Sequence, residues 1–310
     1  MKRIISAAIV SLIFIVSFVG LAQAALSDYF VDTEWLAVNR SDVVVLDVRK
    51  APLYYLGHID GALHVDRSEF LSTRNGVKSL VPTTVEFSAL MSRLGVTPET
   101  TVVVYAKDSD PYAARLVWTL QYHGHLKSFV LDGGYDKWSL EGRTVSVLPS
   151  SAPAPTDYRL AVAEPGPDLR AEGDYVLTRI ANRSVVVWDT RRLSEHVGSE
   201  VRADRGGHIP GAIHLNWEDL QKEVGGAKVL KGEEEIRVLL SAKGITPDRE
   251  IIAHCQTGIR SSYATLVLLG LNYQRAKNYD GSWIEWANNQ SLPIAVLTAE
   301  NEAQQQTLLR

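Results

Sequence analysis

The chain contains a single cysteine, Cys255, and the residues around it are of types that support nucleophilic chemistry. Residues 251–254, apolar except for His254, precede it and predict a buried strand, while residues 263–271 have the pattern of a helix that begins near Ser261. A thiol between a strand and a helix N-terminus faces backbone N–H groups and a dipole that favour an anion. With Arg260 nearby, the sequence therefore predicts a thiolate whose pKa is lower than that of an ordinary cysteine.

The alternative interpretation of Cys255 is a small buried hydrophobic residue, which is the usual role of a free cysteine. A core cysteine does not require Gly258, Arg260 and two serines directly after it. A loop over these residues that curls around the sulfur aims further N–H groups at it. We therefore expect Cys255 to be functional.

The chain carries one structural unit twice. Four short motifs of the first half recur in the same order in the second half, which is far beyond chance. The paired segments are residues 43–49 and 185–191, 57–64 and 207–214, 95–98 and 244–247, and 132–138 and 280–286. Between the copies, three prolines within residues 149–155 predict a stiff, extended linker.

Within each copy, short β-branched apolar runs alternate with helical patterns. The expected strands, too continuously apolar for a sheet with one wet face, are residues 43–46, 102–105, 185–188 and 251–254. Helices are expected at residues 85–94 and 233–243, each followed or ended by a glycine. The alternation predicts an α/β fold in which each copy has a mostly parallel sheet flanked by helices. Ligands of such sheets bind beyond the carboxyl ends of the strands, which places the chemistry just after His254.

These patterns divide the chain into four parts. Residues 1–24 are expected to be a signal peptide, and residues 25–148 a domain without a catalytic cysteine. Residues 149–168 are the proline-rich linker, and residues 169–310 are the domain that carries Cys255.

The motifs in combination resemble the rhodanese family of sulfurtransferases. The resemblance covers residues 28–289 and rests on the tandem copies, the Gly-His-Ile-x-Gly-Ala motif, the Asp-Gly-Gly/Ser segment and the Cys-x-x-Gly-x-Arg loop. It implies the rhodanese α/β fold in each half and a cysteine that takes a sulfane sulfur from a donor such as thiosulfate. The cysteine holds this sulfur as a persulfide and passes it to cyanide or to a thiol. No metal or organic cofactor is implied.

The resemblance also assigns roles to individual residues. Cys255 matches the persulfide cysteine, and Arg191 matches a family arginine near the anionic donor. The N–H cradle is implied to consist of Gln256, Thr257, Gly258, Ile259 and Arg260. Because the donor and the persulfide are both anionic, preorganised N–H groups and an arginine are suitable stabilisers.

The ending of the loop leaves the donor open. Tandem enzymes that use thiosulfate or 3-mercaptopyruvate commonly end this loop in Gly-Val-Thr, whereas this chain has Gly258-Ile259-Arg260. The latter form is more frequent in single-domain rhodaneses.

Two other functions compete with sulfur transfer. Cysteine-dependent phosphatases and arsenate reductases have a similar loop, but in the phosphatase loop five residues separate cysteine and arginine, and here there are four. A shorter loop makes a smaller cradle, which suits a sulfur atom better than a phosphoryl group, and no aspartate-containing acid loop stands out. A non-catalytic binding module is the third class, against which the retained Cys255 argues.

The first copy has no sulfur nucleophile at the matching position. That position falls on Ala106 or, with a slip of one residue, on Lys107, so we expect a structural role for this half. Arg115 is expected either to reach the interface with the second half or to be a solvated helix residue. His58 and His208 occur in both copies and are expected to make structural hydrogen bonds. Residues 198–205 lengthen only the second copy, and we favour a solvated loop over a border of the substrate entrance.

The first residues have the order of a secretory signal peptide: a basic start, an apolar run and the small-x-small site Ala22-Gln23-Ala24. An uncleaved membrane anchor is the alternative, and no later stretch is apolar enough to span a bilayer. Cleavage predicts a periplasmic or secreted protein without a stable membrane span. The net charge of −4 gives no general attraction to nucleic acid. We therefore expect only small-molecule partners, a sulfur donor and an acceptor.

Overall fold

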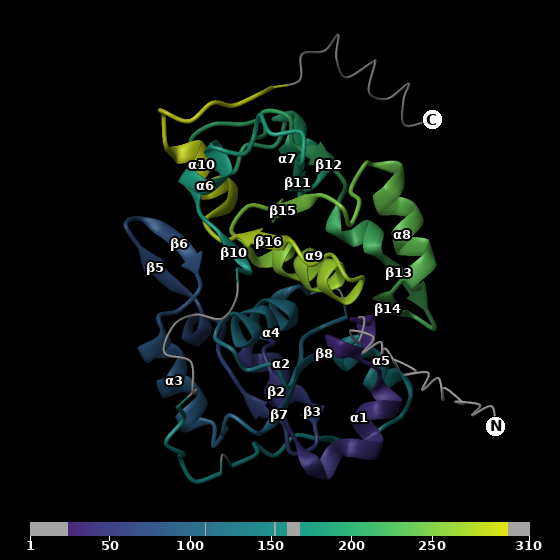
Figure 1. The fold of residues 1–310 in the computed structure, drawn as a ribbon. Coiled ribbons are helices and arrows are strands. Elements are labelled where there is room, and N and C mark those ends of the chain that lie inside the picture. The colour runs from purple at the N-terminus through teal and green to yellow at the C-terminus, as the bar shows by residue number, and fades with distance from the viewer. Residues whose placement is uncertain (1–23, 109, 152, 160–167, 297–310) are drawn as a thin grey trace, which may run out of the picture.

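The computed structural model describes residues 24–108, 110–151, 153–159 and 168–296, which fold into two similar α/β domains (Figure 1). The first 23 residues of the expected signal peptide lie outside the described residues. The sheet of the first domain has the order β1-β8-β7-β2-β4, and every pair in it is parallel. Its strands are β1 (Phe30–Val31), β2 (Val43–Asp47), β4 (Leu63–His64), β7 (Thr101–Tyr105) and β8 (Ser128–Leu131).

The second domain repeats this sheet with the order β10-β16-β15-β11-β12, again with parallel pairs only. Its strands are β10 (Arg170–Ala171), β11 (Val185–Asp189), β12 (Ile213–His214), β15 (Glu250–His254) and β16 (Ala276–Tyr279). Three antiparallel pairs lie outside the two sheets. They are β3 (His58–Ile59) with β9 (Val145–Ser146), β5 (Ser72–Arg74) with β6 (Val77–Leu80), and β13 (Gln221–Val224) with β14 (Ala227–Leu230).

Ten α-helices lie in the described parts of the chain. Those of the first domain are α1 (Thr33–Asn39), α2 (Ala51–Leu56), α3 (Thr84–Arg93), α4 (Tyr112–Tyr122) and α5 (Gly134–Leu140). Those of the second are α6 (Gly173–Leu177), α7 (Leu193–Val197), α8 (Glu233–Ala242), α9 (Ile259–Gly270) and α10 (Ser282–Asn288). None of these helices is long and apolar enough to cross a membrane.

The expected strands and helices are confirmed with small shifts of their ends. The central strand pairs have the same register in both domains, since Asp47 lies opposite Tyr105 and Asp189 opposite His254. Because the strands are parallel, their carboxyl ends meet at one edge of each sheet. The segment after His254, where the sequence places the chemistry, therefore lies beside the segment after Asp189.

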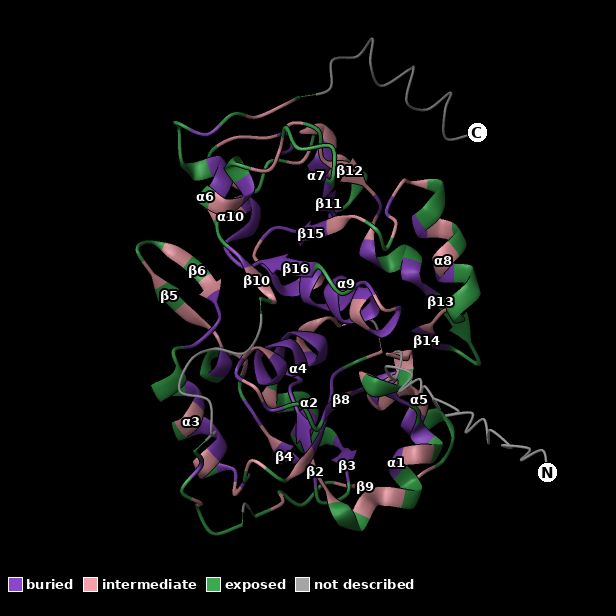
Figure 2. Ribbon diagram, in the orientation of Figure 1, coloured by how far each residue is buried: buried purple, intermediate pink, exposed green. Residues whose placement is uncertain are grey.

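The two domains share one hydrophobic core. Helices α4 and α9 pack against each other where the domains meet, and both are buried over most of their length (Figure 2). The ring of Tyr263 lies 5.4 Å from that of Phe30 in the first domain and 5.4 Å from that of Trp217 in the second. Apolar residues of both domains belong to the same buried cluster, so neither half completes this core alone.

Two matched aspartates each accept a hydrogen bond from the other domain across this interface. Asp132 of the first domain accepts the backbone N–H of Leu230 at 2.8 Å. Asp280, its counterpart in the second copy, accepts the N–H of Val81 at 3.0 Å. Each carboxylate is thus held by a backbone donor of the other domain, and the duplication of the sequence appears as a pseudo-symmetry of the contacts.

The described part of the linker lies along the first domain. Tyr158 is buried, and its hydroxyl is 3.0 Å from Nδ1 of His125. Thr156 donates its N–H to the carbonyl of Ser92 at 3.0 Å. The end of the first structural unit therefore includes residues of the proline-rich segment.

Candidate active site

Cys255 lies between the end of β15 and the start of α9, as the sequence predicted, although α9 begins at Ile259 rather than near Ser261. Gly258 is the N-cap of this helix and has φ of +75°, in the left-handed region. A Cβ atom there would lie 2.5 Å from the carbonyl oxygen of Asp280. The loop therefore needs a glycine at this position for its conformation and for its close packing.

The loop is held from behind by the N-terminus of α10. The N–H of Trp283 donates to the carbonyl of Cys255 at 3.0 Å, and the N–H of Ile284 donates to that of Gln256 at 2.9 Å. In a trans peptide the N–H and the C=O point in opposite directions. Fixing the Gln256 carbonyl toward α10 therefore directs the N–H of Thr257 to the other side, where it bonds to the cysteine sulfur.

The carbonyl of Gly258 is also fixed from behind. Its three donors are Oγ of Ser262 at 2.6 Å, Nδ2 of Asn278 at 3.0 Å and Nη1 of Arg115 at 3.3 Å. Arg115 belongs to the first domain, so it does reach the interface. The peptide planes of the loop are thus set by groups outside it before any substrate binds.

The Cys255 side chain is buried, with 1% of the residue exposed. Burial raises the pKa of its thiol, but the charge of Arg260 and hydrogen bonds from Ser261 and the Thr257 N–H outweigh this effect. The net result is a pKa below the ordinary value, the direction predicted from the sequence. The arrangement favours an anionic sulfur in a dry site.

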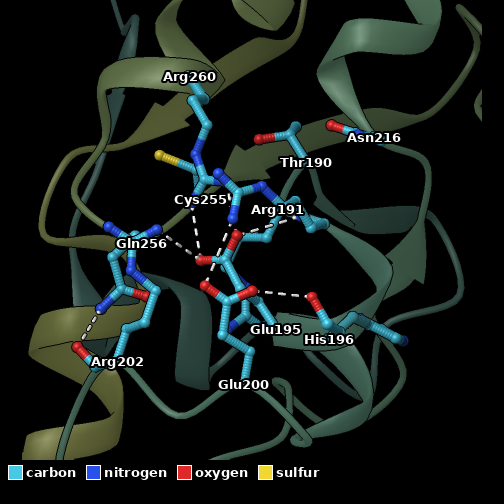
Figure 3. A network of polar contacts seen from close by, with 12 residues as sticks. Thr190, Arg191, Glu195, His196, Glu200, Arg202, Asn216, Cys255, Gln256 and Arg260 are labelled. Carbon is cyan, nitrogen blue, oxygen red and sulfur yellow. Dashed lines mark hydrogen bonds and ion pairs between the residues drawn. The ribbon is translucent and has the colours of Figure 1, made fainter.

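Arg260 is anchored beside the sulfur by Glu195 of α7 (Figure 3). The two side chains form a bidentate pair with N–O distances of 2.7 and 2.9 Å, and the Glu195 side chain is fully buried. Burial raises the pKa of the Glu195 carboxyl, but its bonds to Arg260 hold that pKa below its usual value. The pair is therefore ionic, and the Arg260 guanidinium has a fixed plane next to Cys255.

Residues 198–205 are exposed or half-exposed, as expected of a solvated loop, and they also contact residues of this site. The carbonyl of Arg202 accepts a hydrogen bond from Nε2 of Gln256 at 2.8 Å, and its guanidinium lies 3.2 Å from Glu195. Arg205 donates to four carbonyls at the end of the chain's second domain, those of Trp286, Ala287, Asn289 and Leu292. These polar contacts with the domain give the segment a defined position.

Arg191 is buried, and its guanidinium is engaged within the protein. It forms an ion pair with Asp189 at 2.6 Å and donates to the carbonyl of Gly207 at 2.7 Å. Arg49 makes the same contacts with Asp47 and Gly57 in the domain without cysteine. The shared motif belongs to the fold of both domains, and the contact of Arg191 with an anionic donor stays a prediction.

The histidines of the repeated motif make structural hydrogen bonds, as expected. Nδ1 of His58 lies 2.9 Å from the carbonyl of Tyr54, and Nδ1 of His208 lies 2.9 Å from that of His196. Burial lowers the pKa of His208 to about 4, so its ring is neutral at physiological pH. Trp138, Trp283 and Trp286 of the Asp-Gly segments are buried.

The residue of the first domain that matches Cys255 is Ala106. It directly follows β7 as Cys255 follows β15, and its carbonyl accepts the N–H of Tyr135 at 3.0 Å as that of Cys255 accepts Trp283. The alternative match to Lys107 is therefore wrong by one residue. A methyl group stands where the second domain has its sulfur, so no persulfide can form there.

Several residues of the site had no signal in a single sequence. Glu195, Asn278 and Ser282 lie 60, 23 and 27 positions from Cys255, and Ser282 accepts the cysteine N–H at 3.2 Å. The only available hint was Ser282 itself, which replaces the second glycine of the Asp-Gly-Gly segment in the first copy. Within the described residues, no group of three or more His, Cys, Asp or Glu side chains is arranged to hold a metal ion.

Comparison with known proteins agrees with this geometry. The family model for the rhodanese-like domain matches residues 32–141 and again residues 172–289. The chain belongs to the rhodanese-like family. It is a rhodanese-like transferase with two tandem domains, of which only the second carries a cysteine.

Individual relatives match both domains. The chain is 35% identical over 258 residues to a thiosulfate sulfurtransferase of Pseudomonas aeruginosa, an alignment that covers 82% of this chain and 92% of the relative. It is 35% identical over 286 residues to the sulfur carrier protein TtuD of Thermus thermophilus, covering 86% and 96% of the two chains. The wild-type structure of EanB has the same fold, with a TM-score of 0.77 at 23% identity over 89% of this chain and 70% of that one.

Proposed function

We propose that this rhodanese-like protein transfers a sulfane sulfur from thiosulfate to cyanide or a thiol through a persulfide on Cys255. The observation that carries the proposal is the cradle itself, in which a buried thiol with a lowered pKa meets backbone N–H groups and the fixed charge of Arg260. The relatives named thiosulfate sulfurtransferase support the choice of donor. 3-Mercaptopyruvate is the alternative donor.

The first half-reaction needs no external oxidant or proton. The Cys255 thiolate attacks the outer sulfur of thiosulfate, and the sulfur–sulfur bond of the donor breaks as the new one forms. Sulfite leaves with the electron pair of the broken bond, and the enzyme retains an anionic persulfide. The N–H of Thr257 and the Arg260 charge stabilise this anion as they stabilise the thiolate.

The second half-reaction regenerates the thiolate. Cyanide attacks the outer sulfur of the persulfide, its electron pair forms the new carbon–sulfur bond, and the Cys255 sulfur leaves with the pair of the old bond. The products are thiocyanate and the starting thiolate. A thiol acceptor in its thiolate form reacts in the same way and becomes a persulfide.

A cysteine phosphatase or arsenate reductase is less well supported. The four residues between Cys255 and Arg260 make a loop one residue shorter than that of phosphatases. In addition, Arg260 is tied by both of its terminal nitrogens to Glu195 and is less free to clasp a tetrahedral oxyanion. A non-catalytic module is disfavoured because the lowered thiol pKa serves no purpose in simple binding.

The proposal is tested by the mass of the intact protein. After thiosulfate treatment the wild type should gain one sulfur atom, and cyanide should remove it with release of thiocyanate. Cys255→Ser should gain none, since a hydroxyl is almost never ionised at neutral pH and cannot carry a persulfide. Hydrolysis of an aryl phosphate that depends on Cys255, without a persulfide, would favour the phosphatase instead.

We also propose that the protein is exported and that cleavage follows Ala24. The support is the order of the first residues, with Lys2 and Arg3 before the apolar run and Ala22-Gln23-Ala24 after it. N-terminal sequencing of exported protein should begin at Ala25, whereas a retained Met1 on membrane-bound protein would contradict cleavage.

A further inference from the structure

Arg115 connects the domain without a cysteine to the loop that carries one. It lies on α4, is fully buried, and donates from Nη1 to the Gly258 carbonyl at 3.3 Å and from Nη2 to Oδ1 of Asp280 at 2.7 Å. Both acceptors belong to the second domain. A buried arginine whose charge is neutralised across a domain interface is a specific contact, because leaving either charge unpaired there is costly.

The Gly258 carbonyl is a sensitive point for this contact. The peptide that joins Gly258 to Ile259 lies between the two residues whose N–H groups bond to the cysteine sulfur, Thr257 and Ser261. Since the peptide is planar, holding its oxygen fixes its whole orientation. Arg115 therefore acts on the middle of the cradle without contacting the sulfur.

Asp280 extends the contact to the other side of the loop. Its backbone carbonyl packs so closely on Gly258 that a Cβ would be 2.5 Å away, and Ser282, two residues later, accepts the N–H of Cys255. The second carboxylate oxygen of Asp280 accepts the N–H of Val81 and is 3.2 Å from Nε of Arg170. The Arg115–Asp280 pair thus holds the segment on which the loop rests.

The first domain is shaped to present Arg115. Nη2 also donates to the carbonyl of Ser79 at 2.8 Å, and Ser79 has φ of +64°, a left-handed conformation that is unfavourable for serine. Strain of this kind persists only where surrounding contacts hold it. In this conformation Ser79 directs its carbonyl to the Arg115 guanidinium and so orients that group toward the second domain.

We propose that Arg115 is a positioning residue of the sulfur cradle, so that the first domain takes part in sulfur transfer although it has no cysteine. The inference rests on the proposed function only in taking Cys255 as the sulfur carrier. The charged group that faces the sulfur from its own loop is Arg260, held by Glu195 of α7. Arg115 acts on the backbone instead, and Asp280 cancels its charge.

The test uses the full chain with the paired substitution Arg115→Met and Asp280→Asn. The pair removes one positive and one negative charge together, which avoids an unpaired buried ion. The first readout is the alkylation rate of Cys255 by iodoacetamide as a function of pH, which reports the thiolate fraction and needs no sulfur donor. The second is the KM and kcat of sulfur transfer from thiosulfate to cyanide.

We expect the midpoint of the alkylation profile to rise and the rate at a fixed pH below it to fall about tenfold, with a raised KM for thiosulfate. Arg115→Lys keeps the positive charge, so it should lose less activity than the paired variant. It should not reach the wild-type value, because one ammonium group cannot reach all three acceptors. It also carries the test if the paired variant does not fold. The matched control is Asp132→Asn, whose cross-domain contact is with Leu230, and it should leave the midpoint unchanged.

The outcomes separate this inference from the proposed function. An unchanged midpoint and KM in folded Arg115 variants would overturn the positioning role, even if the wild type forms a persulfide. A shift of equal size in Asp132→Asn would also overturn it, since the effect would then come from general loosening of the interface. If wild-type protein gains no sulfur from thiosulfate, the proposed function fails, while the alkylation profiles still decide the role of Arg115.

Discussion

Glu195 binds the guanidinium of Arg260 with both carboxylate oxygens, at 2.7 and 2.9 Å, and so fixes a positive charge beside Cys255. The two residues come from different elements, α7 and α9, and the glutamate side chain is fully buried. A bidentate pair of this kind sets the plane of the arginine as well as its position. The lowered pKa of Cys255 depends in part on that charge.

Glu195→Gln should therefore impair sulfur transfer while leaving the cysteine and the arginine in place. The amide keeps the size of the side chain but accepts at only one oxygen, so the plane of Arg260 is less well defined. We expect kcat/KM for thiosulfate to fall about tenfold, which corresponds to ~1.4 kcal/mol. Glu200→Gln is the control, since Glu200 contacts Arg192 and Ser194 and not Arg260, and it should change kcat/KM less than twofold. Equal effects in both variants would argue against this role of Glu195.

Inserting one glycine between Gln256 and Arg260 should change the preferred chemistry. The longer loop has five residues between cysteine and arginine, as in cysteine phosphatases, and encloses a larger space. Persulfide formation should fall, and affinity for phosphate-like oxyanions should rise. The paired measurement is sulfur transfer to cyanide and inhibition by inorganic phosphate on the same preparation. Unchanged sulfur transfer in the insertion variant would show that loop length does not select sulfur.

Lys107→Ala should leave sulfur transfer within about twofold of the wild type. Lys107 comes after Ala106, the residue that matches Cys255, in a domain that has no sulfur nucleophile. The measurement is thiocyanate formation at saturating thiosulfate and cyanide, with Cys255→Ser as the inactive reference. Loss of turnover in a folded Lys107→Ala protein would require a direct role for the first domain's loop.

Acid should destabilise the protein through its buried histidines. Burial lowers the pKa of His123, His208 and His254 to about 4 each, whereas in the unfolded chain these rings have ordinary values. Between the two values the unfolded chain binds more protons, so their contribution to stability is complete above the unfolded pKa and is lost as the pH falls toward 4. Each ring should contribute a slope of up to about 1.4 kcal/mol per pH unit.

The measurement is the free energy of unfolding by denaturant at several pH values between 4 and 7. His123→Gln provides the comparison, because His123 lies in the domain without a cysteine, where its Nε2 is 3.1 Å from the carbonyl of Pro82 and its ring stacks on Phe87. The difference between variant and wild type should vary with pH over this window. A constant difference would mean that His123 is not held neutral by burial.

The sequence predicted the parts of the site that are close together along the chain. Hydrophobic periodicity and turn residues are local signals. They were enough to predict the strand before Cys255, the glycine and arginine after it, and the helix that follows. The alternation of strands and helices in both copies also predicted the parallel sheet and the position of the site at its carboxyl edge. The duplication also identified the half without a cysteine, although the structure was needed to choose Ala106 over Lys107.

The groups that hold the loop could not be found in this way. Glu195 and Asn278 are polar residues within buried elements, and nothing local distinguishes a partner of the loop from a surface residue. Arg115 was a candidate for the interface, but the sequence did not choose between that role and a solvated helix position. Their roles depend on packing between elements and, for Arg115, between domains. The same reason explains why the contacts of Arg202 with Gln256 and Glu195 were not predicted, since an insertion rich in charge resembles an exposed loop until its acceptors are known.

The single core that runs through α4 and α9 makes the two halves one cooperative unit. Unfolding either domain exposes apolar surface on the other, so heat or denaturant should melt both in one transition rather than two. A fragment that contains only one domain would expose to solvent the apolar face of α4 or α9 that is buried between the domains. Such a fragment should be prone to aggregate. Although the sequence repeats, we expect that the copies do not have separate stabilities, so a destabilising substitution in the half without a cysteine should lower the folded population of the half that carries the thiol.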